Sequence, residues 1–153
     1  MVGNAPSSLL MPSLTKTSAG IKVAILLEEL KEGYGKEYTV FVMNGSERET
    51  MKHWWIRIAP GGKVPCVIDR DQGRYAITEG HAILNYLTRH YDPALQYSFA
   101  DPLEACAAEQ WISWLHAGLG TFVIATVQHR PHDWTMLEAR ERYLTLITRS
   151  RTG

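Results

Sequence analysis

Two short apolar runs joined by a tight turn constrain the fold of this chain more than any other feature. Residues 64–69 (VPCVID) and 75–78 (YAIT) are rich in β-branched and other apolar side chains, and residues 70–73 (RDQG) between them end in glycine. This arrangement is typical of a β-hairpin. The pattern therefore predicts two adjacent antiparallel strands near the middle of the chain.

Strand and helix patterns alternate ahead of the hairpin. The predicted strands are residues 9–15 and 37–43, and the predicted helices are residues 21–31, 46–57 and 79–91. Pro12 lacks a backbone donor, so we expect the first strand to be an edge strand or irregular. The resulting order, β-α-β-α-β-β-α, indicates an α/β domain that is complete by residue 91.

The composition changes after residue 91, and no further strand is predicted. Residues 92–100 (DPALQYSFA) are predicted to form a linker. Asp101, Pro102 and Glu104 then favour a helix start, because Asp and Glu side chains accept from free backbone N–H groups while proline fits the first turn. The predicted helices run from residue 101 to about 128, with a bend at Gly118 and Gly120, and from residue 134 to about 149. We therefore expect domains at residues 9–92 and 101–150.

Composition and charge exclude several functions. Lys plus Arg and Asp plus Glu each number 16, which argues against a nucleic acid or an anionic membrane as partner. No apolar run approaches the roughly 20 residues that span a bilayer, and residues 1–8 lack the pattern of a signal peptide. We therefore expect a cytoplasmic protein.

The cysteines and histidines are not spaced for a metal or redox centre. Cys66 and Cys106 form no CxxC pair, which excludes a disulfide oxidoreductase of that type and favours a reduced, intracellular protein. His129 and His132 lack a third ligand, so we expect no metal. Cys66 is interpreted as a core residue rather than a nucleophile.

The hairpin and its flanks resemble a known family. Residues 61–93 (GGKVPCVIDRDQGRYAITEGHAILNYLTRHYDP) are similar to the amino-terminal domain of glutathione S-transferases, where the theta and fungal nitrogen-regulator-like branches show NPNGKVPxLxD…LxESxAIxxYLxxxYDP. Residues 17–30 (TSAGIKVAILLEEL) resemble the family's TPNGxKVxIxLEEL helix, and residues 111–120 resemble the start of its helical domain. The resemblance implies a thioredoxin-like α/β domain followed by a small all-α domain.

The resemblance also implies a glutathione site. In this family, the backbone of the residue before the proline, here Val64, pairs with the cysteinyl part of glutathione, and the bond to Pro65 is a candidate cis peptide. Glu79 and Gly80 would hold the γ-glutamyl end at a helix start, and Lys63 would meet the glycyl carboxylate. The alternatives are a turn proline, a helix-terminal charge and a loop lysine.

The sequence departs from the family at the position that activates the thiol. The Asn of the TPNG loop is Ala19, and the Pro before it is Ser18; the Ser after the family's Glu is Gly80. Ser18 and Thr17 are therefore the nearest hydroxyl groups, and we predict that one of them stabilises the glutathione thiolate.

Three functions agree with these residues. The first is a glutathione S-transferase whose thiolate attacks a hydrophobic electrophile. The second is a glutathione-dependent cis-trans isomerase in fungal secondary metabolism, and the third is a non-enzymatic glutathione-binding or interaction module. The all-α domain is expected to be shorter than in the family, which would leave apolar side chains uncovered and favour a homodimer. Those side chains are Trp111, Trp114, Leu115, Leu119, Phe122, Val123 and Leu144.

Overall fold

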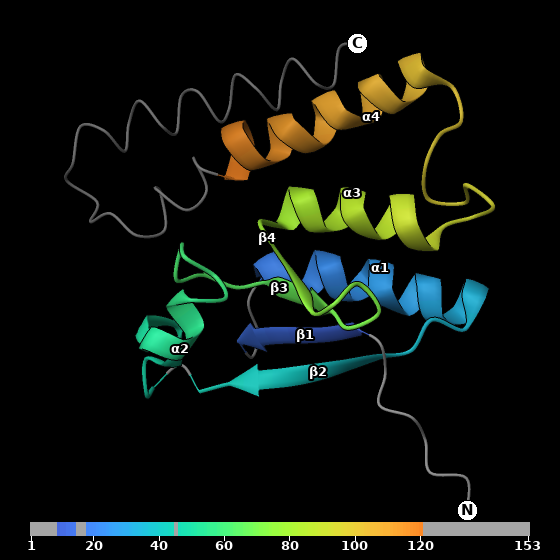
Figure 1. The fold of residues 1–153 in the computed structure, drawn as a ribbon. Helices are drawn as coiled ribbons and strands as arrows, with labels where there is room; N and C mark the ends of the chain where they lie inside the picture. The colour runs from blue at the N-terminus through green and yellow to red at the C-terminus, as the bar shows by residue number, and fades with distance from the viewer. Residues whose placement is uncertain (1–8, 15–17, 45, 121–153) are drawn as a thin grey trace, which may run out of the picture. The chain divides into compact units, whose positions relative to one another are not determined.

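A mixed four-stranded sheet forms the centre of the first unit (Figure 1). The computed structural model describes residues 9–14, 18–44 and 46–120. The strands are β1 (Leu9–Leu14), β2 (Tyr38–Met43), β3 (Cys66–Asp69) and β4 (Tyr75–Thr78), in the order β2-β1-β3-β4. β1 is parallel to β2 and antiparallel to β3, and β3 and β4 form the predicted hairpin. The expected α/β class is confirmed.

The helices of the first unit differ in detail from the prediction. They are α1 (Ser18–Tyr34), α2 (His53–Ile56) and α3 (Gly80–Tyr91), with a 3-10 turn, η1 (Glu49–Met51), before α2. α1 is longer than predicted because the backbone becomes left-handed only at Gly35, whose N–H donates to the Lys31 carbonyl at 2.9 Å. The helix predicted at residues 46–57 is divided into η1 and α2 because Lys52 between them is extended.

Pro12 does not make β1 irregular, contrary to the expectation. Residues 9–14 pair with residues 38–43 in an unbroken parallel register, with Pro12 opposite Phe41. On its other side β1 pairs with β3 through Leu9 and Leu10. Pro12 therefore lies beyond the part of β1 that pairs with β3, and its missing donor interrupts no bond there.

The two faces of the sheet are covered by different elements. Leu9, Met11 and Val67 pack with the apolar sides of α1 and α3 in a cluster that also contains Ile77. Side chains alternate along a strand, so the neighbouring strand residues point to the opposite face. On that face a smaller cluster is formed by Met43, Trp55, Ala59 and Cys66. The larger core thus lies beneath α1 and α3.

A buried carboxylate joins the hairpin to α3. Asp69, at the end of β3, has no exposed surface, and its side chain accepts hydrogen bonds from the hydroxyl groups of Tyr86 (2.7 Å) and Tyr91 in α3. It also accepts from the backbone N–H groups of Asp71 (2.9 Å) and Gln72 (3.3 Å) in the turn. Burial alone would raise the pKa of Asp69, but these bonds outweigh it and leave the pKa below its ordinary value.

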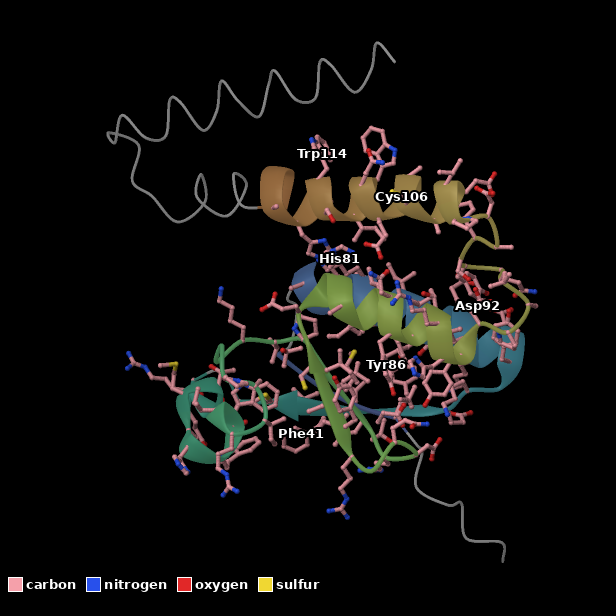
Figure 2. The ribbon with its side chains drawn as sticks, turned by 45° about the horizontal axis from the view of Figure 1, so that its top comes forward. Phe41, His81, Tyr86, Asp92, Cys106 and Trp114 are labelled. Atoms are coloured by element: carbon pink, nitrogen blue, oxygen red, sulfur yellow. The ribbon has the colours of Figure 1, made fainter. Side chains whose placement is uncertain are left out.

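A second buried carboxylate ties the ends of two helices together. Asp92, which follows α3, accepts from the Tyr34 hydroxyl of α1 at 2.5 Å (Asp92 is labelled in Figure 2). It also accepts from the N–H groups of Gln96 and Tyr97 and from the Ser98 hydroxyl, each at 2.8 Å. Residue 92, where the linker was predicted to begin, is therefore anchored to the first unit. Burial opposes ionisation of Asp92, yet the hydrogen bonds lower its pKa.

Residues 100–153 form the second compact unit, and residues 1–99 form the first. The second unit begins with α4 (Pro102–Ser113), and the Asp101 carboxylate caps it as predicted, accepting from the N–H groups of Leu103 (2.9 Å) and Glu104 (3.0 Å). A π-helical stretch, η2 (Trp114–Leu119), follows, and the Gly120 N–H donates to the Leu115 carbonyl. A Cβ at Gly120 would lie 2.9 Å from that oxygen, which explains the glycine. The helix predicted at 134–149 lies outside the described residues.

Because the hydrogen bonds to Asp69 favour its ionised form, we expect a measurable loss of stability at acid pH. The pKa of Asp69 is lower in the folded than in the unfolded chain. Its ionised side chain therefore contributes fully to the free energy of unfolding above the unfolded-state pKa, near ~4. This contribution is lost as the pH falls through the folded-state pKa. Asp69→Asn should lower the free energy of unfolding at pH 7 by about 2 kcal/mol. Denaturant unfolding from pH 7 to pH 3 should show the two proteins converging as the pH falls.

The matched control is Asp71→Asn, which removes a carboxylate from the same turn. Asp71 pairs with Lys36 at 3.1 Å near the surface, so its loss should cost less than about 1 kcal/mol. Equal losses for the two variants would show that the buried bonds of Asp69 do not stabilise the fold.

Candidate functional site

The peptide bond between Val64 and Pro65 is cis, as the sequence suggested. Pro65 is buried, Val64 is half-buried and Lys63 is exposed. The loop that leads to this bond is tightly packed at Gly62, where a Cβ would lie 3.2 Å from the Thr50 carbonyl oxygen, and where φ is +61°. Glycine at this position therefore lets the loop pass close to η1.

Glu79 and Gly80 mark the start of α3. The Glu79 carbonyl accepts the first helical hydrogen bond, from the Ile83 N–H at 2.9 Å, and the Glu79 side chain is exposed. Glu79 adopts φ 69° and ψ 119°, a backbone conformation that residues other than glycine rarely adopt. Backbone strain of this kind is concentrated at functional sites, so it draws attention to this residue. No pattern in the sequence indicated this backbone conformation.

The strand register brings these two segments together. Cys66 and Thr78 are directly opposite each other in the β3–β4 hairpin. Pro65 precedes Cys66 and Glu79 follows Thr78, so both leave the hairpin at the same end. Pro65 and Glu79, 14 positions apart in the sequence, thus lie at the same end of the hairpin. The family resemblance predicted that the two segments that contain them bind one ligand, which requires such proximity.

The start of α1 lies at this same end of the sheet. β1 and β3 are antiparallel, with Leu9 opposite Asp69, so the beginning of β3 is directed toward the end of β1. α1 begins at Ser18, shortly after β1 ends. Thr17 lies outside the described residues, and of Ser18 the structure describes only the backbone. The roles predicted for the two hydroxyl groups therefore stay predictions.

Lys22 is a charged residue of this region that no sequence pattern indicated. It lies in the first part of α1 and is half-buried. Burial lowers the pKa of the Lys22 ammonium group, and the negative charge of Glu79 opposes that change. The two charges are thus close enough to interact. Positions 22 and 79 are remote in the sequence, so only the folded chain could connect them.

The cysteines offer no nucleophile at the candidate site. Cys66 follows Pro65 and begins β3, and its side chain is fully buried in the smaller cluster. Burial raises the pKa of its thiol to about 11. Cys106 is exposed on α4 in the second unit. In the described part of the chain no three His, Cys, Asp or Glu side chains gather as a metal site would require. His129 and His132 lie outside it.

Sequence comparisons relate this chain to glutathione S-transferases. The family described as "Glutathione S-transferase, N-terminal domain" matches residues 15–89. A glutathione S-transferase domain-containing protein of Dictyostelium discoideum is 29% identical over 100 residues, which are 65% of this chain and 39% of that protein. Glutathione S-transferase 2 of Schizosaccharomyces pombe is 30% identical over 138 residues, which are 84% of this chain and 55% of that protein. The chain thus spans about half the length of these relatives.

A solved structure shares the fold. The glutathione transferase URE2P8 of Phanerochaete chrysosporium, determined with oxidised glutathione, superposes with a TM-score of 0.80 over 95% of this chain and 66% of that chain, at 19% identity. This similarity confirms the thioredoxin-like domain followed by a helical region. None of the helices in the described ranges combines the length and apolar character needed to cross a membrane.

The burial of Cys66 predicts two thiols of very different reactivity. In the native chain Cys106 should react rapidly with an aromatic disulfide reagent at pH 8. Cys66 should react far more slowly, because burial shields its sulfur from the reagent and raises the pKa of its thiol to about 11, so that little thiolate forms at pH 8. Absorbance of the released thiol over time gives both rates.

Two single substitutions assign the rates. Cys106→Ser should remove the fast phase, and Cys66→Ser the slow one, while denaturant should make both thiols react quickly. A fast reaction at Cys66 in the folded chain would contradict the buried position.

Proposed function

Because the chain belongs to the glutathione S-transferase family through its amino-terminal domain, we propose that it binds glutathione at the end of the hairpin where Val64–Pro65 and Glu79–Gly80 meet. The strand register that places these segments side by side is the observation that carries the proposal. An extended tripeptide has backbone groups along one side and a charge at each end. The loop before β3 and the start of α3 offer the matching groups.

Each part of glutathione has a partner in this proposal. The backbone of Val64 pairs with the cysteinyl residue as an added strand would. The γ-glutamyl carboxylate lies at the start of α3, where free N–H groups of Gly80 and the following residues favour an anion. The Glu79 carboxylate holds the neighbouring ammonium group, and Lys63 meets the glycyl carboxylate.

The proposed activity is transfer of glutathione to a hydrophobic electrophile. The hydroxyl group of Ser18 or Thr17, with the N–H groups at the start of α1, stabilises the thiolate. The thiolate forms a carbon–sulfur bond, and the leaving group departs with the electron pair of the bond that breaks. The protein contributes binding, orientation and a lower thiol pKa. A cytoplasmic location agrees with a need for reduced glutathione.

Two other outcomes share the same binding site. If glutathione adds to a conjugated double bond and is expelled after rotation, the reaction is a cis-trans isomerisation, which suits an enzyme of fungal secondary metabolism. If the thiol is not activated, the domain is a glutathione-binding or interaction module. Ala19 and Gly80, where the family has Asn and Ser, are the observations that favour the module.

The second unit is proposed to pair with a second copy of the chain. Trp111 and Leu115 of the α4–η2 segment, four positions apart on one face, are 61% and 42% exposed, and Leu103 is also exposed. Trp111 and Trp114 make an edge-to-face contact with their ring centroids 5.8 Å apart. Covering such a surface is worth roughly 1.5–3 kcal/mol per large side chain. A two-fold homodimer is the commonest way to cover it.

Glu79→Gln tests the binding site. Glutamine has the same shape as glutamate and meets the same backbone conformation at position 79, but it carries no charge. Glutathione should therefore bind about tenfold more weakly, a loss of about 1.4 kcal/mol in binding free energy. Isothermal titration calorimetry measures the affinity. The control is Glu37→Gln, an exposed glutamate next to the start of β2 and hence at the opposite end of the sheet. Unchanged affinity in Glu79→Gln would refute the assignment.

The double variant Thr17→Ala/Ser18→Ala tests thiol activation. Turnover of glutathione with an aryl halide should fall at least about tenfold, and its rise with pH should move toward the pKa of free glutathione, near ~8.5 for an ordinary thiol. Glutathione affinity should change little, because neither hydroxyl holds the charged ends. Tyr34→Phe, about 24 Å away at the other end of α1, should leave the pH profile unchanged. Full activity in the double variant would contradict the proposed role.

A further inference from the structure

Two opposite charges continue the contact between α1 and α3 toward the candidate site. The two helices lie side by side (Figure 1), and Leu26 of α1 packs in the same core cluster as Ile83 of α3. Lys22 lies four positions before Leu26, and Glu79 lies four positions before Ile83. Residues four positions apart share one face of a helix, so the two charges follow the line of this contact.

The two helices run in the same direction, which brings both charges to one end. Tyr34, the last residue of α1, donates to Asp92, which follows α3, so the carboxyl ends of the helices are joined. Lys22 precedes Tyr34 by 12 positions, and Glu79 precedes Asp92 by 13. In agreement with this placement, the negative charge of Glu79 counteracts the effect of burial on the pKa of the Lys22 ammonium group.

We propose that Lys22 and Glu79 together recognise the zwitterionic amino-acid group of the γ-glutamyl residue, with the Lys22 ammonium group beside its α-carboxylate and the Glu79 carboxylate beside its α-ammonium group. This inference rests on the proposed glutathione site and deepens it. It makes the ligand class γ-glutamyl compounds that carry both charges.

A pair of opposite charges is complementary to a zwitterion. Glu79 alone would attract the α-ammonium group of the ligand and repel the α-carboxylate next to it. The positive charge of Lys22 offsets this repulsion and adds an attraction of its own. Because Lys63 is proposed to meet the glycyl carboxylate, each carboxylate of glutathione then has a lysine as partner.

The local structure explains why a side-chain cation is useful here. Gly80, the first residue of α3, contributes an N–H group but no side chain. A hydrogen bond between two charged groups is roughly twice as strong as one between neutral groups. Lys22 is half-buried, and salt screens such a charge less than a fully exposed one. An ammonium group has three donors, so Lys22 can contact Glu79 and a ligand carboxylate together.

Two glutathione analogues test this recognition without any change to the protein. γ-Aminobutyryl-cysteinylglycine lacks the α-carboxylate, and glutaryl-cysteinylglycine lacks the α-ammonium group. Isothermal titration calorimetry should show that each binds to the unaltered chain at least about tenfold more weakly than glutathione, because one charge-assisted contact is lost.

A substitution at position 22 assigns the loss to Lys22. Lys22→Gln should weaken glutathione binding about tenfold but leave the affinity for γ-aminobutyryl-cysteinylglycine unchanged, because that ligand has no α-carboxylate. Lys22→Arg keeps the charge and should retain most of the glutathione affinity. The matched control is Lys31→Gln in the last turn of α1, where Lys31 pairs with Glu37 at 3.3 Å. This control should bind glutathione as the unaltered chain does.

The pattern of losses decides between recognition and a purely structural role. Weaker binding of glutathione by Lys22→Gln, without weaker binding of the analogue that lacks the α-carboxylate, supports the proposal. A structural role would weaken the binding of both ligands equally, and that result overturns it. Equal affinity of the unaltered chain for glutathione and this analogue also overturns it, while the glutathione site itself stands. If the unaltered chain binds no glutathione, the proposed function fails and this inference fails with it.

Discussion

The buried carboxylate of Asp69 is the constraint on which the arrangement of the first unit depends. It accepts hydrogen bonds from the turn of the hairpin and from Tyr86 and Tyr91 of α3. The hairpin turn and the end of α3 are therefore held together. A charge without exposed surface is tolerated because four donors replace its water. Asp92 does the same for the ends of α1 and α3, so the two helices that cover the larger core are fixed at their carboxyl ends.

This anchoring at one end leaves the other end of the sheet to the candidate site. The carboxyl end of β1, the cis Val64–Pro65 bond and the start of α3 all meet there. Backbone groups of a loop and of a helix start are suited to an extended, charged peptide, because they offer donors and acceptors in fixed directions. The positive φ of Glu79 and the nearby charge of Lys22 add to the local features of this end. The same site agrees with a transferase, an isomerase or a binding module, since these differ only after glutathione has bound.

Apolar side chains are exposed on two elements of the described residues, one in each unit, and for different physical reasons. The α4 surface, with Trp111, is a helix that carries apolar side chains beyond a single stripe. The β2 surface belongs to the last strand in the order of the described sheet, and it exposes Val40, Phe41 and Val42.

The sequence alone determined the features that depend on local chemistry. The hairpin, the order of elements in the α/β domain and the cap at Asp101 all follow from short stretches of residues, because turns, caps and periodicity act over a few positions. The cis bond before β3 was only a candidate at this level, since most bonds to proline are trans. The tertiary structure decided the rest. Asp69 finds its tyrosine partners 17 and 22 positions away, and Asp92 finds Tyr34 58 positions away. The charge of Glu79 influences the pKa of Lys22 only because β3 and β4 return the chain to the start of α1. Such contacts depend on strand register and helix packing, which are settled by the burial of the whole core rather than by any one segment.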